Sequence, residues 1–365
     1  MILAINAGSS SVKCALFTAE AEPKLVARQT IAATGSHAVP EVLEWAGSSS
    51  SRLAAAGHRI VHGGPKHVTP QWITPEVLDD LRQLVRFAPN HLPDEIAIIE
   101  AFARHDASLR QMACFDTAFH HTMPEVARRL PIPAEYDRRG IRRYGFHGLS
   151  YQYLAGELRR AAGEAIAGGR VILAHLGNGS SLAALRAGRS IDTTMAFTPI
   201  AGVMMSTRSG DLDPGVPTYL GRNEGLSADE VEDVLSKRSG LLGVSGATSD
   251  MKALLRREAS EPACKLAIDM FVYSIAKAVG ALAVALGGVD ALVFSGGIGE
   301  HAPAIRSRIC APLEFLGIEI DESRNANDAP LISPDARRVQ VRVIPTDEEL
   351  VIARAACRLL AEKVT

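Results

Sequence analysis

The stretch "INAGSSSVK", from Ile5 to Lys13, places groups that bind phosphate oxygens between two apolar runs. Serine hydroxyls, free backbone N–H groups, the amide of Asn6 and the cation of Lys13 all suit phosphate oxygens. The spacing differs from that of the phosphate-binding loop G-x-x-x-x-G-K-[ST]. From this stretch alone two interpretations stay open, a phosphate-binding turn or a plain hairpin turn with a surface lysine.

Two charged residues fall within or directly after apolar runs. In "GHRIVHGG", the alternation of a strand puts Arg59 and Val61 on one face, where they would hold an anion beside an apolar pocket. The alternative is an edge-strand arginine in a structural ion pair. Asp116 ends the run "MACFD", a position typical of catalytic or metal-orienting carboxylates in open α/β sheets. A helix N-cap is the competing interpretation.

Two later segments also carry groups that suit phosphates. In "STRSGDLDPG", Arg208 presents a planar cation that fits phosphoryl oxygens, within a loop too polar for a core. The turn "FSGGIGE" lies between an apolar strand and a helical pattern. Its glycines would let a nucleotide approach the backbone closely.

Elements of an α/β fold must position these residues. Thr74 and Pro75 predict the start of a helix, and the Ser227/Glu230 pair predicts a capping box. The C-terminal stretch predicts an amphipathic helix whose first turn carries Asp347, Glu348 and Glu349. Helices that alternate with short apolar strands indicate sheets covered by helices. The expected strands span Ile2–Ile5, Arg59–Val61, Met112–Phe115, Val171–Leu176, Leu292–Phe294 and Val339–Ile344.

The opening turn has an echo 171 residues later. Gly8-Ser9-Ser10 aligns with Gly179-Ser180-Ser181, and each turn lies between two apolar runs. Unless the match is a coincidence, it predicts two similar domains that each open with a strand, a Gly/Ser turn and a second strand. Two such turns would approach one polyphosphate from opposite walls of a cleft. The boundary is expected near 143–147.

Composition sets further limits. A chain of 365 residues predicts two domains, and 47% hydrophobic with 22% charged residues is typical of a globular protein. The net charge of −2 argues against nucleic-acid or anionic-membrane partners. Five scattered cysteines without a C-x-x-C pair predict a reduced, cytoplasmic protein. The long apolar stretch from Lys265 includes Asp269 and Lys277, which favours a buried helix over a membrane span.

Taken together and in their order along the chain, the motifs resemble those of the acetate kinase family, which belongs to the acetate and sugar kinase/Hsp70/actin superfold. The resemblance rests on "INAGSSSVK", "GHRIVHGG", "FDTAFHHTMP", "RRYGFHG", "AHLGNGSS", "STRSGDLDPG", "GVSGATSDM", "GGIGE" and "IPTDEELVIA". It implies two related, ribonuclease H-like α/β domains with a cleft between them, over 1–146 plus 348–365 and over 147–347. It also implies ATP-dependent, reversible phosphorylation of a short-chain carboxylate to an acyl phosphate by a homodimer that uses Mg²⁺ or Mn²⁺, with acetate as the expected substrate.

The resemblance also implies roles for individual residues. The metal ion would be bound by Asn6 and Glu348. The catalytic residues would be Asp116, Arg59, Arg208 and His147, with His91 near the transferring phosphoryl group. The carboxylate pocket would comprise Arg59, Val61, Asn90, Phe146 and Pro199. The nucleotide would contact Ser10, Lys13, His175, Gly177, Asn178, Gly179, Asp250, Met251, Lys252, Gly297, Ile298, Gly299 and His301.

Elementary chemistry agrees with such a site. A carboxylic acid has a pKa of about 4 to 5, so the nucleophile is already ionised at neutral pH and needs no general base. Fixed cations must instead offset its repulsion from ATP. Asp116 is therefore either a metal orienter or, as in a sugar kinase, a base. The polar Asn90 keeps propionate or a hydroxy acid as alternatives, and a non-catalytic nucleotide switch of the actin or Hsp70 kind is the alternative from another class.

Overall fold

The computed structural model describes residues 1–8, 11–47, 52–335 and 337–362. The chain forms two compact units. The first unit comprises Met1–His121, Phe146–Tyr153 and Asp347–Thr365, and the second comprises Thr122–Gly145 and Leu154–Thr346. The functional domain boundaries expected at residues 146/147 and 347/348 stay a prediction.

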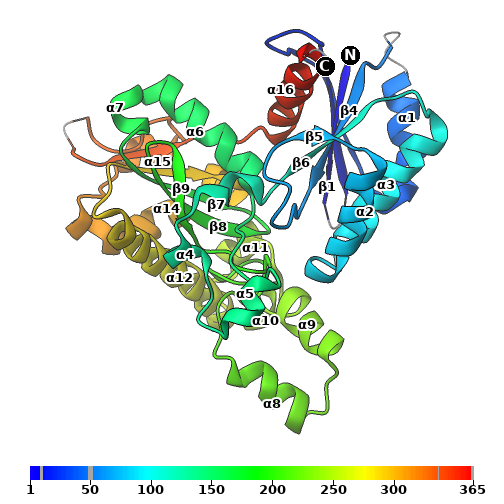
Figure 1. The fold of residues 1–365 in the computed structure, drawn as a ribbon. Coiled ribbons are helices and arrows are strands. Elements are labelled where there is room, and N and C mark those ends of the chain that lie inside the picture. Colours follow the sequence, from blue (N-terminus) through cyan, green and yellow to red (C-terminus); the bar gives the residue numbers. More distant parts are fainter. Residues whose placement is uncertain (9–10, 48–51, 336, 363–365) are drawn as a thin grey trace. The chain divides into compact units, whose positions relative to one another are not determined.

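The first unit contains a six-stranded mixed sheet. Its hairpin strands β1 and β2 and the following β3 pair antiparallel, whereas β4 and β6 run parallel to β1 (Figure 1). The strand order is β3 (Leu25–Ile31), β2 (Val12–Phe17), β1 (Ile2–Ala7), β4 (Ala55–Ile60), β6 (Gln111–Phe115) and β5 (Gln71–Trp72).

Helices cover both faces of this sheet. They include α1 (Val39–Gly47), α2 (Pro75–Leu84), α3 (Leu92–His105) and α16 (Glu348–Ala361). Alternate residues of β1 point to opposite faces. Leu3 and Ile5 pack in a core with residues of α1 and α3, whereas Ile2 and Ala4 pack with residues of α16. Burying each such large aliphatic side chain contributes about 1.5–3 kcal/mol. The C-terminal helix is thereby joined to the first strand of the chain.

The second unit contains a five-stranded sheet with the order β11 (Gln340–Val343), β10 (Ala291–Ser295), β7 (Arg170–Leu176), β8 (Ser180–Arg186) and β9 (Arg189–Thr193). Strands β7, β8 and β9 pair antiparallel, and β10 and β11 run parallel to β7. The two sheets therefore share one topology, in which β1, β2, β3, β4 and β6 correspond to β7, β8, β9, β10 and β11. The expectation of two similar α/β halves, each opening with a hairpin, is confirmed.

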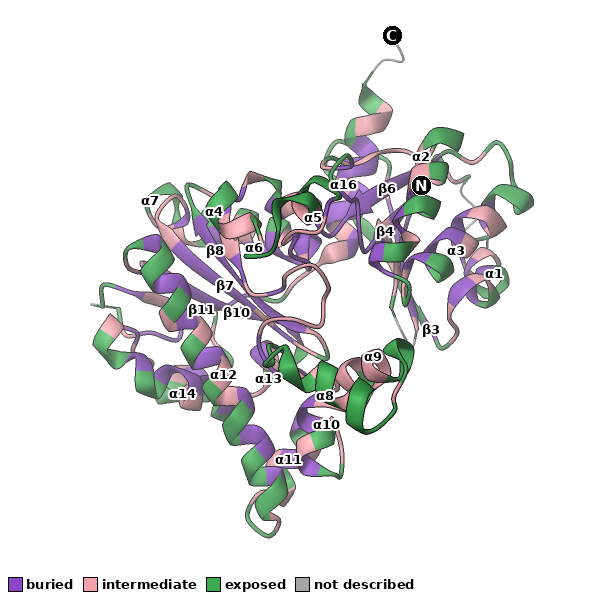
Figure 2. Cartoon of the chain, turned by 60° about the horizontal axis from the view of Figure 1, so that its bottom comes forward, coloured by how far each residue is buried: buried purple, intermediate pink, exposed green. Residues whose placement is uncertain are grey.

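The remaining helical segments are η1 (Gly35–Ala38), η2 (Val85–Phe87), η3 (Ala118–Thr122), α4 (Glu125–Arg128), α5 (Ala134–Arg138), α6 (Gly148–Ala162), α7 (Glu164–Ala167), α8 (Gly215–Asn223), α9 (Ala228–Lys237), α10 (Gly240–Ser245), α11 (Met251–Arg257), α12 (Pro262–Leu286), α13 (Gly296–His301), α14 (Pro303–Cys310), η4 (Ala311–Leu316) and α15 (Glu322–Ala326). Helices α8 and α9 contain no fully buried residue, and α8 exposes most of its residues, as the green and pink segments of Figure 2 illustrate.

Helix starts predicted from local signals are confirmed. The Thr74 hydroxyl accepts a hydrogen bond from the Val77 N–H at the start of α2. Ser227 and Glu230 form the capping box of α9. Strands β3, β5 and β9 were not among the expected strands. Strand β3 exposes most of its side chains and β5 has two residues, so neither carries a strong apolar pattern.

In the part of the chain that the structure describes, α12 alone is long and apolar enough to cross a membrane by length and composition. Its Phe271, Ile275 and Val279 side chains are completely buried in the core of the second unit. This packing is that of a core helix, as expected from the charged residues within the same stretch.

Candidate active site

Arg59 and Asp116 form an ion pair at the carboxyl ends of two neighbouring parallel strands. Arg59 lies near the end of β4, and Asp116 follows β6 directly. The Arg59 Nε and Nη2 atoms lie 3.0 and 2.5 Å from Asp116 Oδ2, and Nη1 donates to the Ala7 carbonyl at 3.1 Å. The ion-pair alternative is therefore observed, but its edge-strand part is wrong because β4 lies between β1 and β6.

The electrostatics of this pair keep Arg59 charged. Burial alone would lower the pKa of Arg59, but the charges of Asp116 and Glu348 and the hydrogen bond to Asp116 outweigh it and raise that pKa. The Asp116 side chain is buried, whereas Arg59 keeps part of its surface in solvent. The pair thus presents a fixed cation at the carboxyl ends of parallel strands, where ligands commonly bind.

The segment Phe146–Gly148 packs directly on the backbone of Asp116. The Gly148 N–H donates to the Asp116 carbonyl at 3.0 Å, and a Cβ on Gly148 would lie only 2.0 Å from that oxygen. His147, one residue earlier, has a left-handed backbone with φ of 58°. Non-glycine residues rarely adopt this conformation, and it is concentrated at functional sites. The close approach brings the predicted catalytic His147 next to Asp116.

Asn6 and Glu348 meet although they are far apart in the sequence. The Asn6 Nδ2 donates to Glu348 Oε2 at 2.8 Å and to Glu349 Oε1 at 3.1 Å. Burial and the neighbouring Glu349 raise the pKa of Glu348, while Arg59, Asn6 and Lys13 oppose the shift. Lys13 is the register partner of Asn6 across the β1–β2 hairpin, so both side chains lie on one face of the sheet. The Gly8 N–H donates to the Ser11 carbonyl at 2.9 Å in this turn, and the predicted Ser10 lies outside the described residues.

A buried carboxylate that the sequence did not indicate lies beside the predicted acyl pocket. Glu95 of α3 accepts hydrogen bonds from the Val61 N–H at 3.1 Å (Oε2) and 3.3 Å (Oε1). Burial raises the pKa of Glu95 to about 8, Asp116 and Asp94 add to the shift, and Arg59 and the Val61 N–H oppose it. No local signal marks Glu95, because an acidic residue in the first turn of a helix ordinarily indicates only favourable interaction with the helix dipole.

The other residues of the first unit predicted to line the acyl pocket differ in exposure. Phe146 is buried, its ring lies 5.7 Å from that of His62, and its carbonyl lies 3.0 Å from His120 Nε2. Asn90 is exposed, and the half-buried His91 is the N-cap residue of α3. Val61 and Phe146 thus supply buried apolar surface, whereas Asn90 faces solvent.

In the second unit, Arg208 and Pro199 come together. The Arg208 Nη1 donates to the Pro199 carbonyl at 3.1 Å. The Met205 N–H donates to the Arg208 carbonyl at 3.1 Å, which closes the loop. Gly240, with φ of 62°, packs so closely that a Cβ there would lie 2.2 Å from the Met205 oxygen. Backbone contacts of α10 therefore fix the loop that carries Arg208.

Two turns predicted to bind the nucleotide lie side by side in the second unit. His175 is the register partner of Ser295, because β7 and β10 run parallel. A Cβ on Gly177 would lie 3.8 Å from His175 Nε2 and 3.9 Å from the Gly297 nitrogen. A Cβ on Gly297 would meet nothing within 4 Å, so open space adjoins its backbone.

The Arg208 loop also adjoins the first of these turns. The Ser206 N–H donates to the Asn178 carbonyl at 3.3 Å. The Gly177 N–H donates to the Gly179 carbonyl at 3.1 Å in this turn, which joins β7 to β8 as the turn after β1 joins β1 to β2. Gly177, Asn178 and Gly179 are therefore brought close to Arg208 through Ser206.

The remaining predicted nucleotide residues differ in accessibility. Asp250 accepts a hydrogen bond from the Ala253 N–H at 2.6 Å as the N-cap of α11, and Lys252 is exposed. Met251 is buried in the core of the second unit, and Ile298 packs partly against the same core. His301 exposes most of its side chain.

Comparison with known proteins identifies relatives along nearly the whole chain. The model of the Acetokinase family matches residues 37–354. An acetate kinase of Rhodopseudomonas palustris (strain TIE-1) is 46% identical over 392 aligned positions, which cover 98% of each chain. An acetate kinase of Clostridium beijerinckii (strain ATCC 51743 / NCIMB 8052) is 45% identical over 320 positions, covering 86% of this chain and 80% of that protein.

Solved structures of the same fold agree. The crystal structure of Porphyromonas gingivalis acetate kinase has a TM-score of 0.88 at 35% identity and covers 98% of this chain and 99% of its own. A propionate kinase from Francisella tularensis subsp. tularensis SCHU S4 also has a TM-score of 0.88 at 35% identity, with 97% and 98% covered. The shared strand topology of the two sheets agrees with the superfold expected from the motifs. The chain is thus a member of the acetate kinase (Acetokinase) family.

Proposed function

We propose that this protein catalyses the ATP-dependent, reversible phosphorylation of a short-chain carboxylate, acetate first, to an acyl phosphate. The observation that carries the proposal is the Arg59–Asp116 pair at the strand ends of a chain that belongs to the acetate kinase family. A carboxylate nucleophile needs a fixed cation more than it needs a base.

The chain's own residues divide this task. Arg59 binds the incoming carboxylate, and Arg208 binds the transferring phosphoryl group, where a guanidinium matches the oxygens with paired N–H groups. Asp116 keeps Arg59 charged and oriented. Taking a proton would weaken its ion pair with Arg59, so its geometry favours an orienting role over that of a base. His147 and His91 contribute donors near the phosphoryl group.

The residues near β1 fit a magnesium ion. Asn6 and Glu348 offer an amide and a carboxylate oxygen, which are hard ligands of the kind that Mg²⁺ prefers. Both hydrogen bonds from Asn6 to the glutamates use the amide nitrogen, so they leave its oxygen uncommitted. Mg²⁺ in kinases is usually held by one or two protein ligands with the substrate phosphates. When bound, the ion supplies charge neutralisation at the phosphates, and Mn²⁺ suits the same donors.

We assign ATP or ADP to the turns of the second unit. The adjacent backbones of Gly177 and Gly297 and the open space beside Gly297 support this assignment, since glycines let phosphates approach the main chain. Asn178, Gly179, Ile298, Gly299 and His175 would complete the phosphate side. Lys252, Asp250 and His301 would lie toward the base, and the buried Met251 would only support them.

A homodimer in the cytoplasm is the expected form of the enzyme, without nucleic-acid or membrane partners. Leu266, Met270 and Tyr273 of α12 expose apolar side chains at the spacing of one helix face. Such a face is typical of a subunit interface. It supports a dimer of these chains through α12.

A kinase for a different small acid is the second candidate. The polar, exposed Asn90 beside His91 supports it, and one of the structural relatives is a propionate kinase. A hydroxy acid would offer an additional hydrogen-bonding group to an amide side chain.

The test mixes the protein with MgATP and a panel of acetate, propionate and a 2-hydroxy acid, and traps acyl phosphate with hydroxylamine. We expect the most hydroxamate with acetate. Tight ATP binding without product from any acid would contradict the proposal and favour a non-catalytic nucleotide switch.

A substitution tests the assigned role of Arg208. Arg208→Ala should lower turnover about 10²- to 10³-fold, as expected for loss of one electrostatic donor. Its melting temperature should stay close to that of the wild type, because the loop is fixed by backbone contacts. The matched control is Arg222→Ala on the exposed helix α8, which should keep full turnover. A collapsed fold in Arg208→Ala would instead make Arg208 structural.

A further inference from the structure

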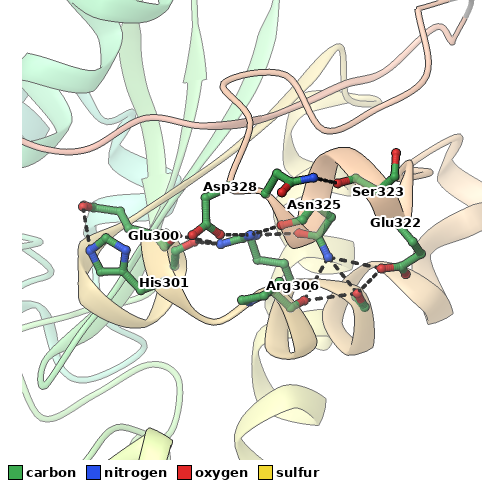
Figure 3. Close-up of polar contacts among 11 residues, drawn as sticks. Glu300, His301, Arg306, Glu322, Ser323, Asn325 and Asp328 are labelled. Atoms are coloured by element: carbon green, nitrogen blue, oxygen red, sulfur yellow. Dashed lines mark hydrogen bonds and ion pairs between the residues drawn. The ribbon is translucent and has the colours of Figure 1, made fainter.

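Arg306 of α14 is completely buried in the second unit, which is unusual for an arginine. Its Nη1 donates to the carbonyls of Gly299 and Glu300 at 2.8 and 2.9 Å. These two carbonyls belong to the end of α13, the short helix formed by the "GGIGE" turn. Figure 3 shows Arg306 between this helix and the segment that contains Asn325 and Asp328.

The other nitrogens of Arg306 bind that second segment. Nε donates to Asn325 Oδ1 and Nη2 to the Asn325 carbonyl, both at 2.7 Å. Nη2 also donates to Asp328 Oδ1 at 2.5 Å. Each of the five N–H groups of the guanidinium thus has an acceptor.

Asn325 is itself held in place. Its Nδ2 donates to the Pro303 carbonyl at 3.0 Å and to Ser307 Oγ at 2.8 Å, with Glu322 nearby (Figure 3). Because the amide nitrogen is used by α14, the amide oxygen must point to Arg306. The contacts of Asn325 with α14 therefore fix the oxygen that accepts from Arg306 Nε.

The opposite end of α13 is held by a second carboxylate. Glu300 Oε1 accepts a hydrogen bond from the Gly296 N–H at 2.8 Å and another from the Thr346 N–H at 3.3 Å. Gly296 needs a positive φ of 76°, and a Cβ there would lie 2.7 Å from the Leu176 carbonyl. The turn is thus tied at both ends, by Glu300 and by Arg306.

Packing alone does not account for this arrangement. A buried arginine must be fully paired, and an apolar side chain of similar volume often stabilises a protein as well or better. Unlike an apolar side chain, the guanidinium fixes the orientation of the Gly299 and Glu300 carbonyls at the end of the turn. The turn carries Gly297–Gly299, which we assigned to the nucleotide.

We propose that Arg306, Asn325 and Asp328 form a clamp that positions the 296–301 turn and thereby determines nucleotide affinity. The proposal rests on the proposed function, in which this turn contacts ATP. These three residues are positioning residues, because they act through the turn and not on the substrate.

The test uses Asp328→Asn. Asparagine has the same shape and tolerates the left-handed backbone of Asp328, whose φ is 48°, so only the charge is lost. We expect the KM for MgATP to rise about tenfold, the change produced when the carboxylate acceptor of a hydrogen bond becomes a neutral amide oxygen. The KM for acetate and kcat at saturating ATP should change less than about twofold, since a turn that contacts only the nucleotide contributes uniform binding.

The matched control is Asp335→Asn. Asp335 pairs with Arg324 at 2.7 Å in the same unit, whereas Asp328 pairs with the buried Arg306, so loss of the Asp335 charge should leave both KM values unchanged. Arg306→Lys is the second variant, which keeps the positive charge and loses the planar set of N–H donors. It should raise the KM for MgATP at least as much as Asp328→Asn does.

Hydrogen exchange of the amides of the 296–301 turn gives a readout without substrates. Faster exchange in Asp328→Asn together with the higher KM for MgATP would support the clamp. A lower melting temperature with an unchanged KM for MgATP would overturn it while the proposed function stands. A wild-type protein that binds no nucleotide would overturn both.

Discussion

Glu95 is a buried carboxylate whose pKa differs from that of an ordinary glutamate. It lies between the Val61 amide and the charges of Arg59 and Asp116. Burial disfavours the ionised form of a carboxylate, so the protonated form persists to unusually high pH. The neighbouring Asp116 stays bound to Arg59. Two carboxylates in the same region thus have different tasks, set by their partners.

Glu95 should make the stability of the protein depend on pH. Its pKa rises from about 4.5 to about 8 on folding, so the folded state keeps a proton that the unfolded state loses in this range. Stability from this group is present below about pH 4.5 and is lost as the pH rises through about 8. In Glu95→Gln this loss should disappear, so the melting temperature of the wild type should fall relative to that of the variant between pH 5 and 8.

The measurement is a series of thermal melts at constant ionic strength. Glu100→Gln is the control on the same helix, where the partly exposed carboxylate pairs with Arg82. Its curve should run parallel to that of the wild type. Parallel curves for Glu95→Gln as well would show that Glu95 is ionised throughout this pH range.

Short elements hold the charged residues in place. The parallel strands β4 and β6 end beside each other, which brings Arg59 and Asp116 together. The start of α6 then lies against the backbone that follows β6, because Gly148 has no side chain to prevent the approach. Four residues are predicted to be catalytic, and three of them, Arg59, Asp116 and His147, lie in the first unit. Two strand ends and one glycine position these three residues.

Gly148→Ala should disturb this arrangement. The added Cβ would lie 2.0 Å from the Asp116 carbonyl and 2.9 Å from Phe119 Cβ, so α6 or Asp116 must move. A displacement of about 1 Å can cost about 10²-fold in turnover, and we expect a loss of that size with a lower melting temperature. The control is Gly156→Ala in the same helix, where a Cβ meets nothing within 4 Å. It should retain activity and gain up to about 1 kcal/mol of stability. Normal turnover in Gly148→Ala would refute the positioning role.

The whole molecule combines two units of one topology with different additions. The first sheet has the extra strand β5, and the second unit has the long helix α12 and the helices α8 and α9, which contain no fully buried residue. The apolar face of α12 is the feature that a single chain leaves unexplained. Large apolar faces at the surface usually become buried by association.

Met270→Glu should therefore dissociate the expected dimer. A charge placed in the centre of an apolar interface opposes its burial. Light scattering after size-exclusion chromatography should give the mass of two chains for the wild type and of one chain for the variant. The control is Val126→Glu, at an exposed valine of α4, which should leave the mass unchanged. A wild type that elutes as one chain would contradict the dimer.

Local features were readable from the sequence because their causes lie within a few residues. The N-cap of α2, the capping box of α9 and the two equivalent hairpins depend on short-range hydrogen bonds, and all are observed. The ordered motifs were sufficient to predict the family and its α/β fold. The short or exposed strands β3 and β5 were missed because their pairing, and not their own pattern, makes them strands.

Contacts between distant segments were decided only by the tertiary structure. Asn6 meets Glu348 because α16 packs on β1, and Arg59 proved to lie in an interior strand because β6 pairs beyond it. Glu95 and Arg306 gave no signal in the sequence, since an acidic first turn and a helical arginine are ordinary on a surface. Burial gave them their properties, because desolvation forces a charged group to find partners or to lose its charge.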